Sequence, residues 1–106
     1  MCKSIYKKLR EDFNFVTEYG FSYVSNFEHY EYPSIKFINP NKDTYLSIGM
    51  DYHKWQFTVR YWSIQNWRDW RDFHELDLEL EGAKKSYKSQ LPLVQQQLKE
   101  FLEKSF

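Results

Sequence analysis

The sequence predicts an α+β fold: an N-terminal helix, a four-stranded antiparallel meander, and a C-terminal helix packed on one sheet face as a two-layer sandwich. Three observations predict it. Apolar residues recur at helical spacing near both ends of the chain, they alternate with polar residues in the middle, and short turns separate the alternating segments. The chain has 106 residues, which is the length of one domain spanning residues 1–106.

The N-terminal helix is expected to run from Ser4, a residue type that caps helices, to about Glu18. Gly20 follows as the stop, because glycine readily adopts the left-handed conformation that ends helices. One apolar stripe lies along this helix at spacings of four, four and three residues, and consists of Ile5, Leu9, Phe13 and Val16.

Alternation of apolar and polar residues predicts four strands, at 21–27, 34–39, 44–50 and 55–61. The first is expected to carry an aromatic face formed by Phe21, Tyr23, Ser25 and Phe27. The last shows the most regular alternation, with one face formed by Trp55, Phe57, Val59 and Tyr61. Residues 39–43 (Asn-Pro-Asn-Lys-Asp) are a clear turn, and residues 51–54 form the next reversal. Because three successive connections are short, the strands should form an antiparallel meander.

The segment 63–82 carries two competing signals. Asn66 is a capping residue, which favours a short helix from Trp67 to about Leu76. Leucines then alternate with acidic residues over 76–80, which suits an edge strand instead. We expect a short helix followed by an extended segment, and Gly82 breaks the pattern.

The final helix is expected to begin after Ser89 as its cap. Pro92 would then occupy the third helical position, where its missing N–H costs little. The apolar stripe of this helix consists of Leu91, Val94, Leu98, Phe101 and Leu102.

Aromatic residues are the most unusual part of the composition: nine Phe, nine Tyr and four Trp. Each can bury about 150–250 Å², so a small core needs only some of them. The remainder should lie at the surface, where aromatic side chains are enriched at the energetic centres of protein interfaces. The AT-rich codons of Phe and Tyr offer a compositional explanation for those two residue types, which does not extend to Trp.

Fifteen basic residues balance fifteen acidic ones. The chain therefore lacks the charge that attracts nucleic acids or anionic membranes, and we expect neither as a partner. Cys2 is the only cysteine, which excludes an internal disulfide and fits a reducing cytoplasm. No apolar run resembles a signal peptide or a membrane span.

The triplet Trp-Arg-Asp occurs twice in tandem over residues 67–72. On a helix, residues three apart share a face, so Trp67 would pair with Trp70, and Arg68 with Arg71. Because Trp and Arg dominate interface hot spots, these four residues form a candidate anchor for a partner protein. The alternative interpretation is two core tryptophans beneath a charged outer face, and we expect Trp70 to be the more buried.

A second candidate site consists of His29, Asp51 and His53, which lie in connections at the ends of the first and third predicted strands. Convergence there would allow acid–base chemistry or ligand binding. The alternative is that all three are solvated loop residues. The histidines lack metal-site spacing, and neither a phosphate-binding glycine loop nor a nucleophile elbow is present. We therefore expect no catalytic residue, no metal and no cofactor.

Arg60, Tyr61 and Trp62 combine a cation with two aromatic rings, which is typical of single-stranded nucleic-acid binders. The balanced charge of the chain argues against this interpretation.

The stretch Asp12-Phe13-Asn14-Phe15-Val16 through Tyr19-Gly20-Phe21, with the strands that end in Arg60-Tyr61-Trp62, resembles small uncharacterised bacterial proteins. Some of these are similar to immunity proteins of polymorphic toxin systems. The resemblance covers about the first sixty residues and transfers no catalytic residue. It implies a toxin-neutralising or other protein-binding role. Immunity proteins often have strongly acidic surfaces, so the zero net charge here does not imply a cationic nuclease as the toxin.

The sequence therefore predicts a cytoplasmic, non-enzymatic protein-binding module, most concretely an immunity-type inhibitor of a partner toxin. One alternative is a small enzyme or ligand-binding domain with a cleft near His29, Asp51 and His53. Another is a single-stranded nucleic-acid binder that uses exposed aromatic rings. Surplus aromatic surface also makes a homodimer a candidate assembly.

Overall fold

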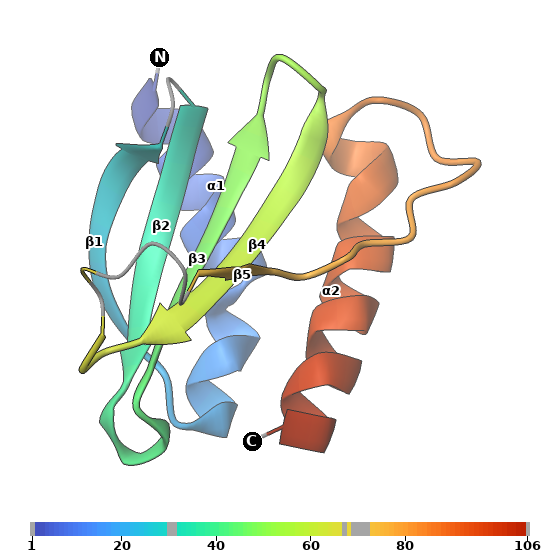
Figure 1. The fold of residues 1–106 in the computed structure, drawn as a ribbon. Coiled ribbons are helices and arrows are strands. Elements are labelled where there is room, and N and C mark those ends of the chain that lie inside the picture. The colour runs from blue at the N-terminus through green and yellow to red at the C-terminus, as the bar shows by residue number, and fades with distance from the viewer. Residues whose placement is uncertain (1, 30–31, 67, 69–72, 106) are drawn as a thin grey trace.

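The computed structural model describes residues 2–29, 32–66, 68 and 73–105. It shows an α+β fold of two helices and an antiparallel sheet; in Figure 1, α1 lies behind the sheet and α2 runs beside β4. The elements in chain order are α1 (Cys2–Asp12), the 3-10 helix η1 (Asn14–Tyr19), β1 (Ser22–His29), β2 (Tyr32–Asn39), the 3-10 helix η2 (Pro40–Lys42), β3 (Thr44–Asp51), β4 (Gln56–Ser63), β5 (His74–Glu75) and α2 (Tyr87–Ser105). The predicted fold class is confirmed. Within the described residues, no helix is long and apolar enough to cross a bilayer.

The five strands are hydrogen-bonded in the order β1-β2-β3-β4-β5, and each pair is antiparallel. The four predicted strands correspond to β1, β2, β3 and β4, which form an uninterrupted antiparallel meander. Short turns join β2 to β3 and β3 to β4, so strands that follow each other in sequence also pair in space.

The fifth strand overturns part of the helix predicted from Trp67 to Leu76. His74 pairs with Tyr61 of β4, and the Leu76 N–H donates to the Val59 carbonyl at 2.8 Å. Residues 74–76 form backbone hydrogen bonds with the edge of β4, and these outweigh the local preference for a helix. Residues 67 and 69–72 of that predicted helix lie outside the described residues.

The N-terminal helix is shorter than predicted, because α1 ends at Asp12 and a tighter 3-10 helix follows. Phe13 joins them with a non-helical φ of −112°. The 3-10 turn places residues three apart on one side, so Phe13 and Val16 are both fully buried. Gly20 ends η1 with a φ of 92°, as predicted. The predicted cap, Ser4, lies inside α1, which begins at Cys2.

The second helix begins earlier than predicted. Its cap is Ser86, whose hydroxyl accepts a hydrogen bond from the Ser89 N–H at 3.2 Å, so Ser89 itself is helical. Pro92 consequently lies in the helix interior and not in its first turn. The predicted stripe is confirmed, with Val94, Leu98 and Leu102 fully buried.

The core lies between the helices and the sheet face that they cover. Ile35, Ile48 and Val59 pair in one row across β2, β3 and β4, and all three are fully buried. Their burial confirms the alternation predicted for these strands. Helix residues complete the core from the other side: Leu9, Phe13, Val16, Val94, Leu98 and Leu102.

A β-bulge in β1 overturns the predicted aromatic face. Tyr23 pairs with Phe37, but Ser25 pairs with Lys36, so Val24 is an extra residue. The bulge reverses the alternation that follows, and Asn26 pairs with buried Ile35 in place of Ser25. Asn26 is therefore turned toward the helices.

Candidate functional site

The turn between β3 and β4 carries an exposed aromatic pair, which we call the aromatic tip (Tyr52 and Trp55). Trp55 is 49% exposed, the highest value among the large hydrophobic side chains that the structure describes, and Tyr52 is 40% exposed. The two rings meet edge to face, with centroids 5.1 Å apart. The tip therefore presents a large aromatic surface to solvent.

The backbone of Trp55 is unusual for such a side chain. Its φ is 52°, in the left-handed region that bulky residues rarely adopt. This conformation costs an L-residue about 1–2 kcal/mol. Trp55 thus precedes β4, and the predicted strand at 55–61 begins one residue late, at Gln56. The face predicted to include Trp55 begins with Phe57.

Gln90 of α2 holds this backbone in place. Its side chain is 2% exposed, and its Nε2 donates to the Trp55 carbonyl at 2.6 Å. Its Oε1 accepts a hydrogen bond from the Phe57 N–H at 3.2 Å. One buried amide therefore fixes both peptide groups that flank Gln56, and with them the entry to β4.

Asp51 organises the other side of the same turn. It is 8% exposed, and its Oδ1 accepts hydrogen bonds from the N–H groups of His53 at 2.9 Å and Lys54 at 3.4 Å. This local arrangement is a common turn-forming use of Asp. The aromatic tip is therefore held on one side by Asp51 and on the other by Gln90.

The predicted site at His29, Asp51 and His53 is only partly assembled. Asp51 and His53 share one turn, whereas His29 ends β1, and β2 lies between β1 and β3. Two strand spacings amount to about 10 Å. Neither Asp51 nor His53 lines a hollow found on the described part of the chain. No group of three or more potential metal ligands occurs among the described residues.

The predicted tryptophan–arginine anchor falls largely outside the described residues, which exclude Trp67, Trp70 and Arg71. Arg68 lies in a turn and is exposed. The anchor stays a prediction.

Arg60, Tyr61 and Trp62 do not share one exposed surface, because successive strand residues point to opposite faces. Arg60 forms an ion pair with Glu75 at 3.2 Å, and Trp62 is only 7% exposed. Tyr61 faces the helices, with its ring 4.9 Å from that of Phe101. The three side chains therefore do not make the stacking platform that a single-stranded nucleic acid would need.

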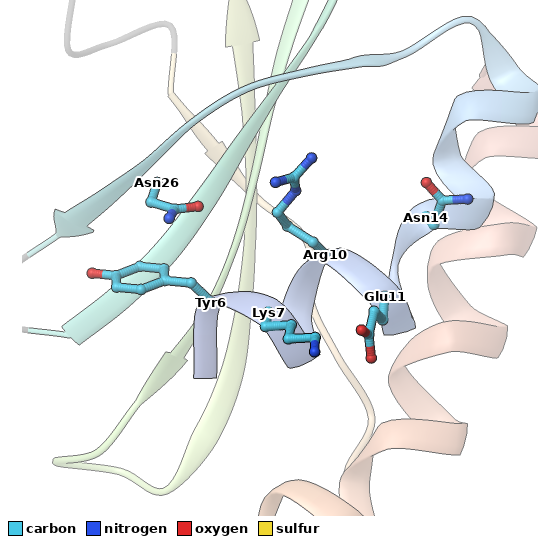
Figure 2. Close-up of a pocket in the computed structure, with 6 residues that line it drawn as sticks. All are labelled: Tyr6, Lys7, Arg10, Glu11, Asn14 and Asn26. Atoms are coloured by element: carbon cyan, nitrogen blue, oxygen red, sulfur yellow. The ribbon is translucent and has the colours of Figure 1, made fainter. Parts of the chain in front are cut away.

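A hollow of about 600 Å³ lies between α1 and β1, and Figure 2 shows its lining: Tyr6, Lys7, Arg10, Glu11, Asn14 and Asn26. The Arg10 guanidinium lies 3.8 Å from the centre of the Tyr23 ring, and the Tyr23 hydroxyl donates to Asn26 Oδ1. The contact of Arg10 with Tyr23 joins α1 to the edge strand, and the Tyr23–Asn26 hydrogen bond lies within that strand. We call this feature the α1–β1 hollow.

Sequence reasoning missed both the aromatic tip and the α1–β1 hollow. For the hollow a signal existed, because Tyr6, Arg10 and Asn14 recur every four residues, beside the apolar stripe. Asn26 could not be added to them, since its orientation depends on the bulge. For the tip, the reversal at 51–54 was predicted, but the alternation of Trp55 with Phe57 assigned Trp55 to the following strand and not to the turn.

Comparisons of this chain with models of known protein families, with curated proteins and with solved structures found no match. The resemblance to immunity proteins therefore stays a prediction.

Proposed function

We propose that this protein is a non-enzymatic protein-binding module whose aromatic tip inserts into a partner protein. The observation that carries the proposal is Trp55, a half-exposed ring on a left-handed backbone. Strained conformations persist where surrounding structure imposes them, and they concentrate at binding and switch sites. Burial of the Trp55 ring does not account for this conformation, because the ring is half-exposed.

The chemistry of the tip suits an anchor. Trp and Tyr are among the residues that contribute most to binding energy at interfaces. Gln90 and Asp51 already hold the turn in the free protein. A pre-ordered anchor loses little conformational entropy on binding, so more of its contact energy appears as affinity.

The more specific form of this proposal is an immunity-type role, in which the partner is a toxin that this protein neutralises. Its support is the resemblance of the first sixty residues and the small size of the chain. It adds an expectation to the binding proposal: the captured partner should be toxic to cells when this protein is absent.

The first test is Trp55→Gly. Proteins captured by the wild-type chain from extracts of its source cells are identified and purified, and their affinities are compared between variants. Loss of an anchor should cost at least about 2 kcal/mol of binding. This corresponds to a dissociation constant raised about 30-fold. The free energy of unfolding should stay the same or rise by about 1 kcal/mol, because glycine relieves the backbone strain.

The matched control is Phe73→Leu, which removes another exposed aromatic ring. Phe73 is 39% exposed and packs 4.8 Å from the ring of Trp62, near the opposite end of β4 from the tip. The Phe73→Leu variant should bind the partner as the wild type does. Equal affinity of the wild type and Trp55→Gly for every captured protein would overturn the proposal. A loss of more than about 2 kcal/mol of stability in Trp55→Gly would show that the ring is structural.

A further inference from the structure

Within the described part of the chain, β1 forms an edge of the sheet. It is eight residues long and pairs there with β2 alone, while the strand at the opposite edge, β5, is two residues long. The outward backbone groups of an edge strand can accept an added strand. Natural edges are often protected by lysine or proline, and β1 (Ser-Tyr-Val-Ser-Asn-Phe-Glu-His) contains neither.

The bulge restricts where a strand can add. Regular pairing with β2 resumes at Ser25 and continues to His29, so this half of β1 has an undistorted ladder. Five residues match the usual length of a strand in a sheet. An added segment would therefore align with residues 25–29.

The α1–β1 hollow lies beside this half of β1. Asn26 reaches it from the strand, and Tyr6 and Arg10 reach it from the helix (Figure 2). Alternate side chains of an added strand point toward the helix side of the sheet. One of them would enter the hollow next to Asn26.

The hollow is suited to a carboxylate. Lys7 and Arg10 bring two positive charges, against one negative charge from Glu11. The Arg10 guanidinium carbon lies over the Tyr23 ring, and this contact helps to position the charged group beside the hollow. Arginine binds carboxylates through the N–H groups of its guanidinium, often with two parallel hydrogen bonds.

We propose that β1 and the α1–β1 hollow together bind an extended, acidic peptide segment of a partner protein, which adds a strand beside residues 25–29 and places a carboxylate against Arg10. Main-chain hydrogen bonds supply part of the affinity in this mode, and the side-chain pocket supplies the specificity. The proposal goes beyond the aromatic tip, with which this surface shares no residue, and either proposal can fail without the other.

The test uses an acetylated and amidated eight-residue peptide of alternating valine and threonine with one central glutamate. Binding is followed by the amide NMR signals of the isotope-labelled protein. We expect shifts of the amides at 25–29 and of the Asn26 side chain, with an affinity in the millimolar range or tighter. Replacing the peptide glutamate with glutamine should weaken binding about 10-fold, as should Arg10→Gln. The two changes together should cost little more than either alone, because they remove the same contact.

Three controls complete the design. Lys8→Gln removes the same charge from α1, but Lys8 lies over the Tyr87 ring, away from the hollow, so affinity should not change. N-methylation of alternate peptide bonds should abolish binding, because it removes the donors that pair with β1. Trp55→Gly should bind the peptide as the wild type does.

Each remaining outcome would overturn the proposal. Equal binding of the glutamate and glutamine peptides would exclude recognition of a carboxylate. Binding of the N-methylated peptide, or of free glutarate with equal affinity, would show a small-anion site without strand addition. A doubled mass in sedimentation, with the β1 amides protected, would make a second copy the occupant. No shift of the amides at 25–29 would exclude the site altogether.

Discussion

Gln90 shows how one buried side chain can determine a surface feature. Its amide bonds with three backbone groups from two segments: the Trp55 carbonyl and the Phe57 N–H at the start of β4, and the Lys84 carbonyl before α2. Buried amides are stable in a core only when they are hydrogen-bonded, and here both the nitrogen and the oxygen of the amide have partners. The position of the aromatic tip therefore depends on a residue of α2 that is itself hidden from solvent.

The first stability prediction concerns this residue. Gln90→Leu keeps the side-chain volume but leaves buried peptide groups without hydrogen-bond partners. Each unsatisfied group costs about 1–3 kcal/mol of stability. We expect the free energy of unfolding in urea to fall by about 2–4 kcal/mol. Gln96→Leu is the control on the same helix, since Gln96 is exposed and bonds only with Glu100 among the contacts found. It should change stability by less than about 0.5 kcal/mol. Equal losses in both variants would contradict the role assigned to Gln90.

At the scale of elements, local sequence signals and tertiary contacts decide different things. The periodicity of α2 is intrinsic to its sequence, but its first turn depends on Ser86, which caps it three residues before the predicted cap. A residue of α2 likewise holds the extended segment after β5. The Gln97 side chain accepts a hydrogen bond from the Glu79 N–H at 2.7 Å and donates one to the Glu79 carbonyl at 2.9 Å. Element boundaries here are therefore set partly by neighbouring elements.

The position of Pro92 gives a prediction for α2. Inside a helix, proline removes one backbone hydrogen bond, here to the Lys88 carbonyl, and its ring crowds that carbonyl. Pro92→Ala should therefore raise the free energy of unfolding by about 2 kcal/mol. Alanine stabilises the helix by about 3 kcal/mol relative to proline, but it also gives the unfolded chain more conformational freedom, which offsets part of that gain. Thermal melting measures it, with exposed Gln96→Ala as the neutral comparison. No change on Pro92→Ala would indicate that the proline lies in the first turn, as the sequence suggested.

At the scale of the whole molecule, the two helices are joined to each other across the sheet face that they cover. The Tyr87 hydroxyl of α2 donates to the Asp12 carboxylate at the end of α1, and Gln95 donates to the Asp12 carbonyl at 2.7 Å. Burial, followed by the hydrogen bond to Asp12 and the charge of that carboxylate, raises the pKa of Tyr87 far above its ordinary value. The fold thus favours the neutral phenol.

This raised pKa predicts how stability depends on pH. Below pH 10 the phenol is neutral in both the folded and the unfolded chain, so its contribution is complete. Above pH 10 the unfolded chain loses the proton and the folded chain keeps it, so stability falls as pH rises. The melting temperature of Tyr87→Phe should therefore fall less steeply above pH 10 than that of the wild type. Parallel curves for the two proteins above pH 10 would contradict the assignment.

Features set by neighbours along the chain could be predicted from the sequence. The alternation around Ile48 and Val59 correctly indicated buried strand faces, and the stripe around Leu98 indicated the buried side of α2. Gly20 ended its helix at the predicted place. These signals are local, because side-chain burial in a helix or strand repeats with the period of the backbone itself. They were enough for the α+β class and the order of its first four strands.

Only the tertiary structure decided the features on which the two proposals depend. The backbone of Trp55 is held by Gln90, 35 residues away along the chain, and Asn26 faces the hollow because the bulge shifts its pairing with β2. β5 exists because β4 offers an unpaired edge to His74 and Glu75. In each case the backbone hydrogen bonds of a segment depend on another segment of the chain. Local propensity depends on neighbouring residues alone and cannot predict those partners.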